Sequence, residues 1–241
     1  MRRRERGVTL IEVIVSVTLL SLLTAGMLMA LRIGINSFTK VDTKLMDNRR
    51  VAGAQRIVEQ ELQGLVPVVG PCGKMPMRLA FFQGEPQTMR LVSTFSVQQA
   101  WRGQLQILEI FVIPGEEGRG VRLVVNEMPY TGPEAAGQLC TGMAPDPQTG
   151  AAVPHFAPVT AGPHSFVLAD KLAYCRFSYL TVLPDPALPP QWKPGWAMKG
   201  WPLAIRIDMA PLEPDPSRLQ PISVVAPVHI LRNPELNYED R

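Results

Sequence analysis

The feature of the sequence that most constrains its fold is a long apolar run near the N-terminus. From Val8 to Leu31 the chain reads VTLIEVIVSVTLLSLLTAGMLMAL, 24 residues in which Glu12 is the only charged side chain. A helix needs about 20 consecutive apolar residues to cross the hydrocarbon core of a bilayer. The run therefore predicts a membrane-spanning helix.

The position of the prolines divides the chain into two structural regimes. The first proline is Pro67, and all 24 prolines of the sequence follow residue 66. Proline removes a backbone donor and clashes with the preceding helical turn. One helix can therefore extend as far as Leu65, whereas the remainder cannot be mostly helical, and the predicted fold class is α+β.

The charge of the chain is concentrated at its N-terminus. The formal net charge is +3, and the first six residues account for it with four arginines and Glu5. The rest of the chain is neutral, so it offers no basic face and nucleic acid is not an expected partner. Arginines before an apolar run favour a cytoplasmic N-terminus and a following domain on the opposite side of the inner membrane.

Glu12 leaves three interpretations of the apolar run open. The first is a secretory signal peptide cut after a small residue such as Ala25 or Gly26, although the run is long for that purpose. The second is a plain anchor that tolerates the carboxylate at a cost of roughly 2.5–3.5 kcal/mol near the bilayer centre. The third gives the carboxylate a function, which requires a cationic partner.

The residues around Glu12 indicate which partner is expected. A basic leader ends in Gly7 and is followed by Val8-Thr9-Leu10-Ile11-Glu12-Val13. This pattern resembles the class III signal of type IV pilins and type II secretion pseudopilins. The resemblance implies cleavage by a prepilin peptidase after Gly7, N-methylation of Val8, and pairing of Glu12 with the terminal amine of a neighbouring subunit. The family usually has phenylalanine where this chain has Val8.

Within that family the chain is most similar to the J-type minor pseudopilin of the type II secretion system. The similarity rests on AQRIVEQELQGL (54–65), LAYCRFSYL (172–180) and WPLAIRIDM (201–209). It implies a subunit near the tip of a periplasmic filament that supports protein export across the outer membrane. The implied partners are the I-, K- and H-type minor pseudopilins, the major pseudopilin, the prepilin peptidase and inner-membrane lipid.

Two alternatives to this function are kept. One, in the same class, is a minor pilin of a type IV or competence pilus. The other is a membrane-anchored extracytoplasmic enzyme or binding protein. No nucleophile elbow, zinc-protease motif or phosphate loop occurs, so neither enzymatic activity nor a cofactor is expected. His155, His164 and His229 lack acidic or cysteine partners at ligand spacing, and no metal site is predicted.

The chain is expected to divide into four parts. They are a leader (1–7), the transmembrane half of the helix (8–33), its amphipathic half (34–66), and a periplasmic β-rich pseudopilin domain (67–241). A break near 34–37 would instead give two helices. An apolar stripe in the amphipathic half should pack on the sheet, with Glu59 and Glu61 mostly outside it. The stripe consists of Val51, Ala54, Val58, Leu62 and Leu65.

Residues 67–241 are predicted to form half-buried antiparallel strands. The strand segments are 78–82, 88–97, 104–113, 121–128, 171–182, 203–209 and 222–231. Two strands alternate clearly, and their inward faces are expected to be Ala173, Cys175, Phe177 and Tyr179, and Leu203, Ile205, Ile207 and Met209.

Two segments without clear periodicity are predicted to be irregular. Residues 132–163 are rich in Pro, Gly and Ala and are expected to form a long surface loop. Residues 184–202 form a second insert with Trp192, Trp196 and Trp201. These indoles either present a surface to a partner or fasten the insert to its own domain.

The three cysteines have different expected roles. Cys72 and Cys140 both lie in predicted loop sequence and are expected to pair, because disulfides are permitted outside the cytoplasm. Cys175 lies on the apolar face of a predicted strand, where a buried free thiol is expected.

Overall fold

The computed structural model describes residues 9–73, 75–96, 101–146, 150, 152–163, 165–182, 187–198, 200–212 and 221–229. Of residues 36, 38–52, 75–77, 101 and 102 only the backbone is described. The chain forms two compact units, residues 1–49 and residues 50–241, and the second is called the head domain below.

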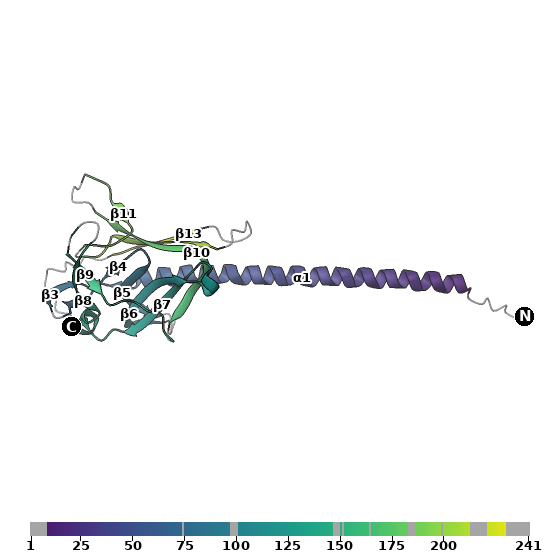
Figure 1. The fold of residues 1–241 in the computed structure, drawn as a ribbon, viewed down its shortest axis with the longest axis horizontal. Coiled ribbons are helices and arrows are strands. Elements are labelled where there is room, and N and C mark those ends of the chain that lie inside the picture. The colour runs from purple at the N-terminus through teal and green to yellow at the C-terminus, as the bar shows by residue number, and fades with distance from the viewer. Residues whose placement is uncertain are drawn as a thin grey trace, which may run out of the picture. The chain divides into compact units, whose positions relative to one another are not determined.

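The described chain begins with a single long helix, α1 (Leu10–Gln63) (Figure 1). Its backbone stays helical through residues 34–37, so the alternative with two helices is wrong. Leu10–Ile35 is long and apolar enough to cross a membrane, and none of these residues is buried. The expected fold class, a long N-terminal apolar helix followed by an antiparallel sheet domain, is confirmed.

The hydroxyl groups of this span bond to their own helix. Ser16 and Ser21 each donate to the carbonyl four residues earlier, at 2.7 Å. Thr18 and Thr24 donate to carbonyls three and four residues earlier. A polar group in hydrocarbon must be satisfied internally, because lipid provides no hydrogen bonds. These four side chains therefore add little cost to membrane insertion.

The head domain is built around an antiparallel sheet. In the described residues the main sheet has the order β1-β5-β6-β7-β10-β12-β13, with β4 paired to β5 and β11 paired to β10 (Figure 1). Two small sheets, β2-β3 and β8-β9, accompany it. The strands are β1 (Leu65–Val66), β2 (Val69–Cys72), β3 (Met75–Ala80), β4 (Gln83–Gly84), β5 (Thr88–Ser96), β6 (Trp101–Pro114), β7 (Val121–Pro129), β8 (Cys140–Pro145), β9 (Ala152–Phe156), β10 (Phe166–Thr181), β11 (Gln191–Lys193), β12 (Ala204–Pro211) and β13 (Ile222–Pro227).

The C-terminal turns of α1 provide the centre of the main core. Ala54, Val58 and Leu62 are buried and pack on the inner face of the sheet, as the apolar stripe predicted. The spacing of four residues places all three on one side of the helix. Glu61 departs from the prediction, because its side chain is also fully buried. The partners from the sheet include Met89, Leu91, Leu108, Ile110, Leu123, Val125, Cys175, Phe177, Tyr179, Ile205 and Ile207.

The end of α1 is held by polar contacts with β5. The Ser93 hydroxyl donates to the Glu61 carbonyl at 3.0 Å. The Thr94 amide donates to the Gly64 carbonyl at 2.9 Å. The final carbonyls of a helix have no intrahelical partner, so bonds of this kind satisfy them. They also fix where the helix ends relative to the sheet.

Residues 132–163 do not form the surface loop predicted from their composition. They contain the short helix α2 (Pro133–Gly137) and strands β8 and β9. With β2 and β3 they form an outer layer around a second core on the other face of the sheet, reached from the sheet by Val92 and Ile107. Gly and Pro suppressed the strand signal in the sequence, while Ala136, Cys140 and Phe156 are nevertheless buried.

Strand β10 is longer than predicted and is shared by two parts of the sheet. Residues Phe166–Leu172 pair with β7, and Leu172–Leu180 pair with β12, with register shifts on either side of Leu172. Because of this bulge, Leu172 is buried and Ala173 is exposed, which corrects the predicted inward position of Ala173. Leu203 was also predicted to face inward, but it precedes β12 and is exposed.

The end of β4 and the turn after it bond to the second half of β10 and to the second insert. The Phe177 amide donates to the Pro86 carbonyl at 2.9 Å, and the Trp196 amide donates to the Gly84 carbonyl at 2.7 Å. A Cβ atom at Gly84 would lie 2.7 Å from the Cβ of Trp196 and 2.8 Å from the Tyr179 ring. Only glycine permits this close approach.

The tryptophans of the second insert mostly face their own domain. The Trp196 ring packs edge-on against Phe82, with centroids 6.4 Å apart, and its indole N–H donates to the Gly200 carbonyl. Trp201 packs against the main core. Trp192 lies beneath the guanidinium of Arg206, 4.6 Å from the ring centroid. For Trp196 and Trp201 the structure therefore favours fastening of the insert over a partner surface.

A disulfide links two strands of the outer layer, β2 and β8. Cys72 in β2 and Cys140 at the start of β8 are linked, with Cα atoms 4.9 Å apart and a sequence separation of 68. Cys175 is the free cysteine and is buried in the main core, where desolvation first and Asp208 second raise its pKa to about 12. A thiol with such a pKa is unreactive at neutral pH.

Alkylation tests this cysteine arrangement. The unfolded chain, treated with iodoacetamide without reductant, is expected to gain one label on Cys175, and three labels after reduction, as measured by peptide mass spectrometry. Modification of Cys72 and Cys140 in the unreduced sample would contradict the disulfide.

Candidate functional site

The first candidate site is the beginning of α1, around Glu12. The helix begins at Leu10, and the Thr9 carbonyl accepts from the amides of Glu12 at 3.0 Å and Val13 at 3.3 Å. Glu12 therefore lies in the first helical turn, where its side chain is exposed. Gly7 and Val8, the predicted cleavage and methylation residues, lie outside the described residues, so their roles stay predictions.

The position of Glu12 permits two chemical roles. A carboxylate in the first turn interacts favourably with the positive end of the helix dipole. The spacing from Thr9 to Glu12 is that of a capping box, in which the acid can accept from the amide of the capping residue. The same exposed carboxylate can also accept a cation from another molecule. Glu12 is the only acidic residue in Leu10–Ile35.

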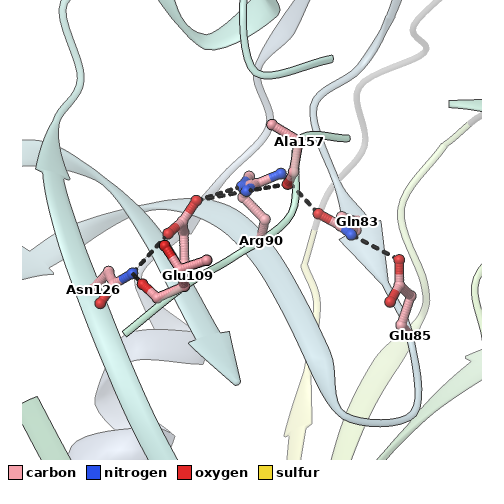
Figure 2. Close-up of polar contacts among 7 residues, drawn as sticks. Gln83, Glu85, Arg90, Glu109, Asn126 and Ala157 are labelled. Atoms are coloured by element: carbon pink, nitrogen blue, oxygen red, sulfur yellow. Dashed lines mark hydrogen bonds and ion pairs between the residues drawn. The ribbon is translucent and has the colours of Figure 1, made fainter. Parts of the chain in front are cut away.

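The second candidate site is a row of polar side chains across the outer face of the sheet. The strand register aligns Gln83 with Arg90, Arg90 with Glu109, and Glu109 with Asn126. The row therefore crosses four strands, β4, β5, β6 and β7. Figure 2 shows the contacts running from Asn126 through Glu109 and Arg90 to Gln83 and Glu85.

The centre of this row is a buried ion pair. Arg90 is 1% exposed and Glu109 is 7% exposed. The Nε and Nη2 atoms of Arg90 donate to Glu109 Oε1 at 2.9 and 2.6 Å. Arg90 Nη1 donates to Gln83 Oε1 at 2.8 Å, and Asn126 Nδ2 donates to Glu109 Oε2 at 2.9 Å. A buried pair is stable only when its remaining polar atoms are also bonded, and this network meets that requirement.

The polar row holds the segment that returns from the outer layer. Arg90 Nη2 donates to the Ala157 carbonyl at 3.0 Å, and Asn126 Nδ2 donates to the Thr160 carbonyl at 3.1 Å. The Phe156 ring lies 5.4 Å from the Arg90 guanidinium carbon. The two hydrogen bonds join residues 67 and 34 positions apart in sequence. The arrangement is therefore suited to fixing structure, and the buried groups offer no open site to a substrate.

The sequence does indicate this row, through single charged residues within apolar strand segments. A search for periodicity alone does not detect them. Arg90 lies between the apolar residues Met89 and Leu91, and Glu109 lies between Leu108 and Ile110. A charge of each sign at the middle of two adjacent, strongly apolar strands is the pattern expected of a cross-strand pair. Its burial depends on the outer layer, which the sequence did not predict.

Other residues with catalytic or ligating potential are not brought together. The His155 ring nitrogen Nδ1 lies 3.0 Å from the Thr141 hydroxyl, and His229 lines a surface pocket with Leu62 and Leu65. His164 lies outside the described residues. Within the described part of the chain, no group of three His, Cys, Asp or Glu side chains is placed to hold a metal ion.

The loop between β6 and β7 is a turn with exposed ion pairs. The Gly115 amide donates to the Gly120 carbonyl at 2.9 Å and closes the loop. Arg122 donates to both carboxylate oxygens of Asp170, at 2.8 and 2.9 Å, and lowers the pKa of that carboxyl. Arg122 also pairs with Glu116. The glycine-rich segment 115–120 therefore forms a turn between β6 and β7.

Comparison with known proteins identifies the N-terminal segment. The prokaryotic N-terminal methylation motif matches residues 2–28. The match contains Glu12 and most of the apolar span. No curated protein matches the chain significantly.

The buried ion pair yields a testable prediction. Arg90→Met should lower the free energy of unfolding by about 3–5 kcal/mol, because it leaves the Glu109 carboxylate buried without its cation. Urea unfolding of the full chain in detergent, followed by tryptophan fluorescence, measures this change. Arg176→Met is the matched control, because Arg176 is exposed on β10, and it should change the value by about 0.5 kcal/mol or less.

A double variant separates charge from packing. Arg90→Met combined with Glu109→Leu removes both charges and should recover a large part of the loss. A double variant that is less stable than Arg90→Met alone would contradict the assignment of the loss to an unpaired buried charge.

Proposed function

We propose that this chain, which carries the N-terminal methylation motif of the type IV pilin-like family, is a minor pseudopilin of a type II secretion system. In this proposal it is a structural subunit near the tip of the periplasmic filament and has no enzymatic activity. Its partners would be the major pseudopilin and the I-, K- and H-type minor pseudopilins. The observation that carries the proposal is the methylation motif at the head of a span able to cross a membrane.

The exposed apolar span supports a role in assembly. Every large hydrophobic side chain of Leu10–Ile35 is about half exposed or more, and none of the span is buried. Lipid can cover such a surface before assembly, and apolar helices of neighbouring subunits can cover it in a filament. An anchor alone would explain the same surface, so variants of Glu12 are needed to distinguish an anchor from an assembling subunit.

Glu12 supports a pairing role in this proposal. A carboxylate entering an apolar environment requires a cation nearby, or it destabilises the assembly. Cleavage after Gly7 would create a new amine at Val8, and the amine of a neighbouring subunit would meet this requirement. The pair would then favour one axial offset between adjacent helices, because every other offset leaves the carboxylate without its cation.

Processing at Gly7 is tested by mass analysis of the protein from its native membrane. The expected N-terminus is N-methyl-Val8, and the prepilin peptidase is the enzyme that would create it. A protein that still begins at Met1, or one cut near Met27 by a signal peptidase, would overturn the proposal.

The pairing role is tested by Glu12→Ala and Glu12→Gln. Both variants should insert and be processed normally but fail to enter filaments, as measured by cross-linking to the major pseudopilin and by export of the secreted substrates. Ser16→Ala is the matched control one turn later, because the Ser16 hydroxyl bonds within its own helix. Normal export by Glu12→Gln would exclude a charged pair and leave only a role at the helix cap.

The same strains separate secretion from a pilus. Loss of the chain should stop export of proteins across the outer membrane and leave surface piliation and DNA uptake unchanged. Loss of piliation or DNA uptake with normal export would instead assign the chain to a type IV or competence pilus.

A further inference from the structure

The most unusual group in the head domain is the carboxyl of Glu61, near the end of α1. Its side chain is fully buried, and neither carboxylate oxygen has a hydrogen-bond partner among the described residues. Leu62, the next residue, is part of the main core. An ionised carboxylate without a partner is costly in such a place, so the geometry requires either a neutral acid or a cation.

Glu61 faces a polar corner of the inner face of the sheet. The strand register places Ser93 opposite Gln106 in β5 and β6, and Glu127 opposite Leu108 in β6 and β7. Ser93 and Gln106 are buried. Leu91, two residues before Ser93, faces the core beneath the helix, which places Ser93 on that side as well. The carboxyl of Glu61 thus lies over polar groups of the sheet.

The polar groups of this corner do not neutralise Glu61. The Ser93 hydroxyl donates its proton to the backbone carbonyl of Glu61 at 3.0 Å. The Ser96 hydroxyl donates to Glu127 Oε2 at 2.8 Å. Glu127 is itself an acid, and a second carboxylate disfavours ionisation of the first.

The charged groups around Glu61 can be assigned to their elements. On α1, Glu59 accepts from Gln55 at 3.0 Å. On β7 the acid that faces Glu61 is Glu127. His229, which follows β13, lines a pocket together with Leu62. The described residues of β5 and β6 at this corner are uncharged, while the side chain of Arg102 is outside the description.

We propose that Glu61 is a proton-binding site whose occupancy controls how firmly the end of α1 is docked on the sheet. With the proton bound, the carboxyl is neutral and the helix end packs as observed. When the proton leaves, a charge appears beneath the helix beside Glu127, and the docked state loses stability. The inference does not depend on the proposed function, because it concerns the head domain of any chain with this corner.

The pH window follows from the two states of the carboxyl. Desolvation first, and Glu127 second, raise the pKa of Glu61 in the folded protein from 4.5 to about 8. Between pH 4.5 and about 8 the folded chain therefore holds a proton that the unfolded chain has lost. Stability from this site is complete below pH 4.5, declines as the pH rises, and is lost above about pH 8. The folding equilibrium constant should fall by about tenfold per pH unit within the window.

The experiment measures urea unfolding of the full chain in detergent from pH 5 to pH 9 by tryptophan fluorescence. Glu61→Gln keeps the shape of the side chain without the titration, so it should remove the decline and be more stable than the original protein at pH 8. Glu59→Gln is the matched control from the same helix and should retain the decline. Glu127→Gln removes the neighbouring charge and should move the upper end of the window to lower pH.

A direct measurement keeps the proposal testable if Glu61→Gln does not fold. In protein labelled with ¹³C-glutamate, one side-chain carboxyl should titrate well above the others, and Glu127→Gln should shift it. Titration of every glutamate near its ordinary pKa, or an equal decline in the original protein and Glu61→Gln, would overturn the proposal. Stabilisation by added K⁺ or Ca²⁺ at pH 7, absent in Glu61→Gln, would overturn it in favour of a bound metal cation.

Discussion

The head domain depends on the contact between the last turns of α1 and the inner face of its sheet. Val58 and Leu62 are essentially inaccessible to solvent and contact residues of the main core. Burial of apolar surface is the dominant favourable contribution to folding. A sheet with one apolar face requires a covering element, and the helix provides it here. The terminal bonds from Ser93 and Thr94 then set the position of that cover.

The opposite face of the sheet adds a further physical principle. The outer layer contributes Leu79, Ala136 and Phe156 to the second core, and it is also held by a disulfide and by the polar row centred on Arg90. Hydrogen bonds are directional and therefore specify one arrangement of the layer. Apolar contacts are non-directional and would by themselves allow several arrangements. Both faces therefore bury a hydrophobic core, and the outer face adds directional bonds and a covalent link.

Much of this fold could be predicted from the sequence because its main elements have strong periodic signals. The stripe of Ala54, Val58 and Leu62 predicted the docked face of the helix. The sheet was predicted from strand segments at 88–97, 104–113, 121–128, 171–182 and 203–209, of which the last two alternate clearly. The prokaryotic N-terminal methylation motif matches residues 2–28, where the sequence had predicted such a signal. The Cys72–Cys140 pair joins two segments of the layer that the sequence left as loop.

The parts that could not be predicted depend on contacts between distant residues. Strands β8 and β9 are rich in residues that favour turns, so local propensity does not predict them. They are stabilised by their contacts within the outer layer. The burial of Glu61 was not predicted, because helical periodicity identifies only the apolar face of α1. It gives no information about the polar groups of the sheet that lie opposite Glu61. The exposure of Ala173 depends on a bulge, which periodicity cannot locate.

That bulge has a consequence for how the sequence of the domain can vary. Before Leu172, β10 is aligned only with β7, and after it with β12. An inserted or deleted residue at the bulge would therefore shift one ladder while leaving the other in place. The two halves of the sheet behave as modules joined by one strand, and each can accumulate changes of length without destroying the register of the other.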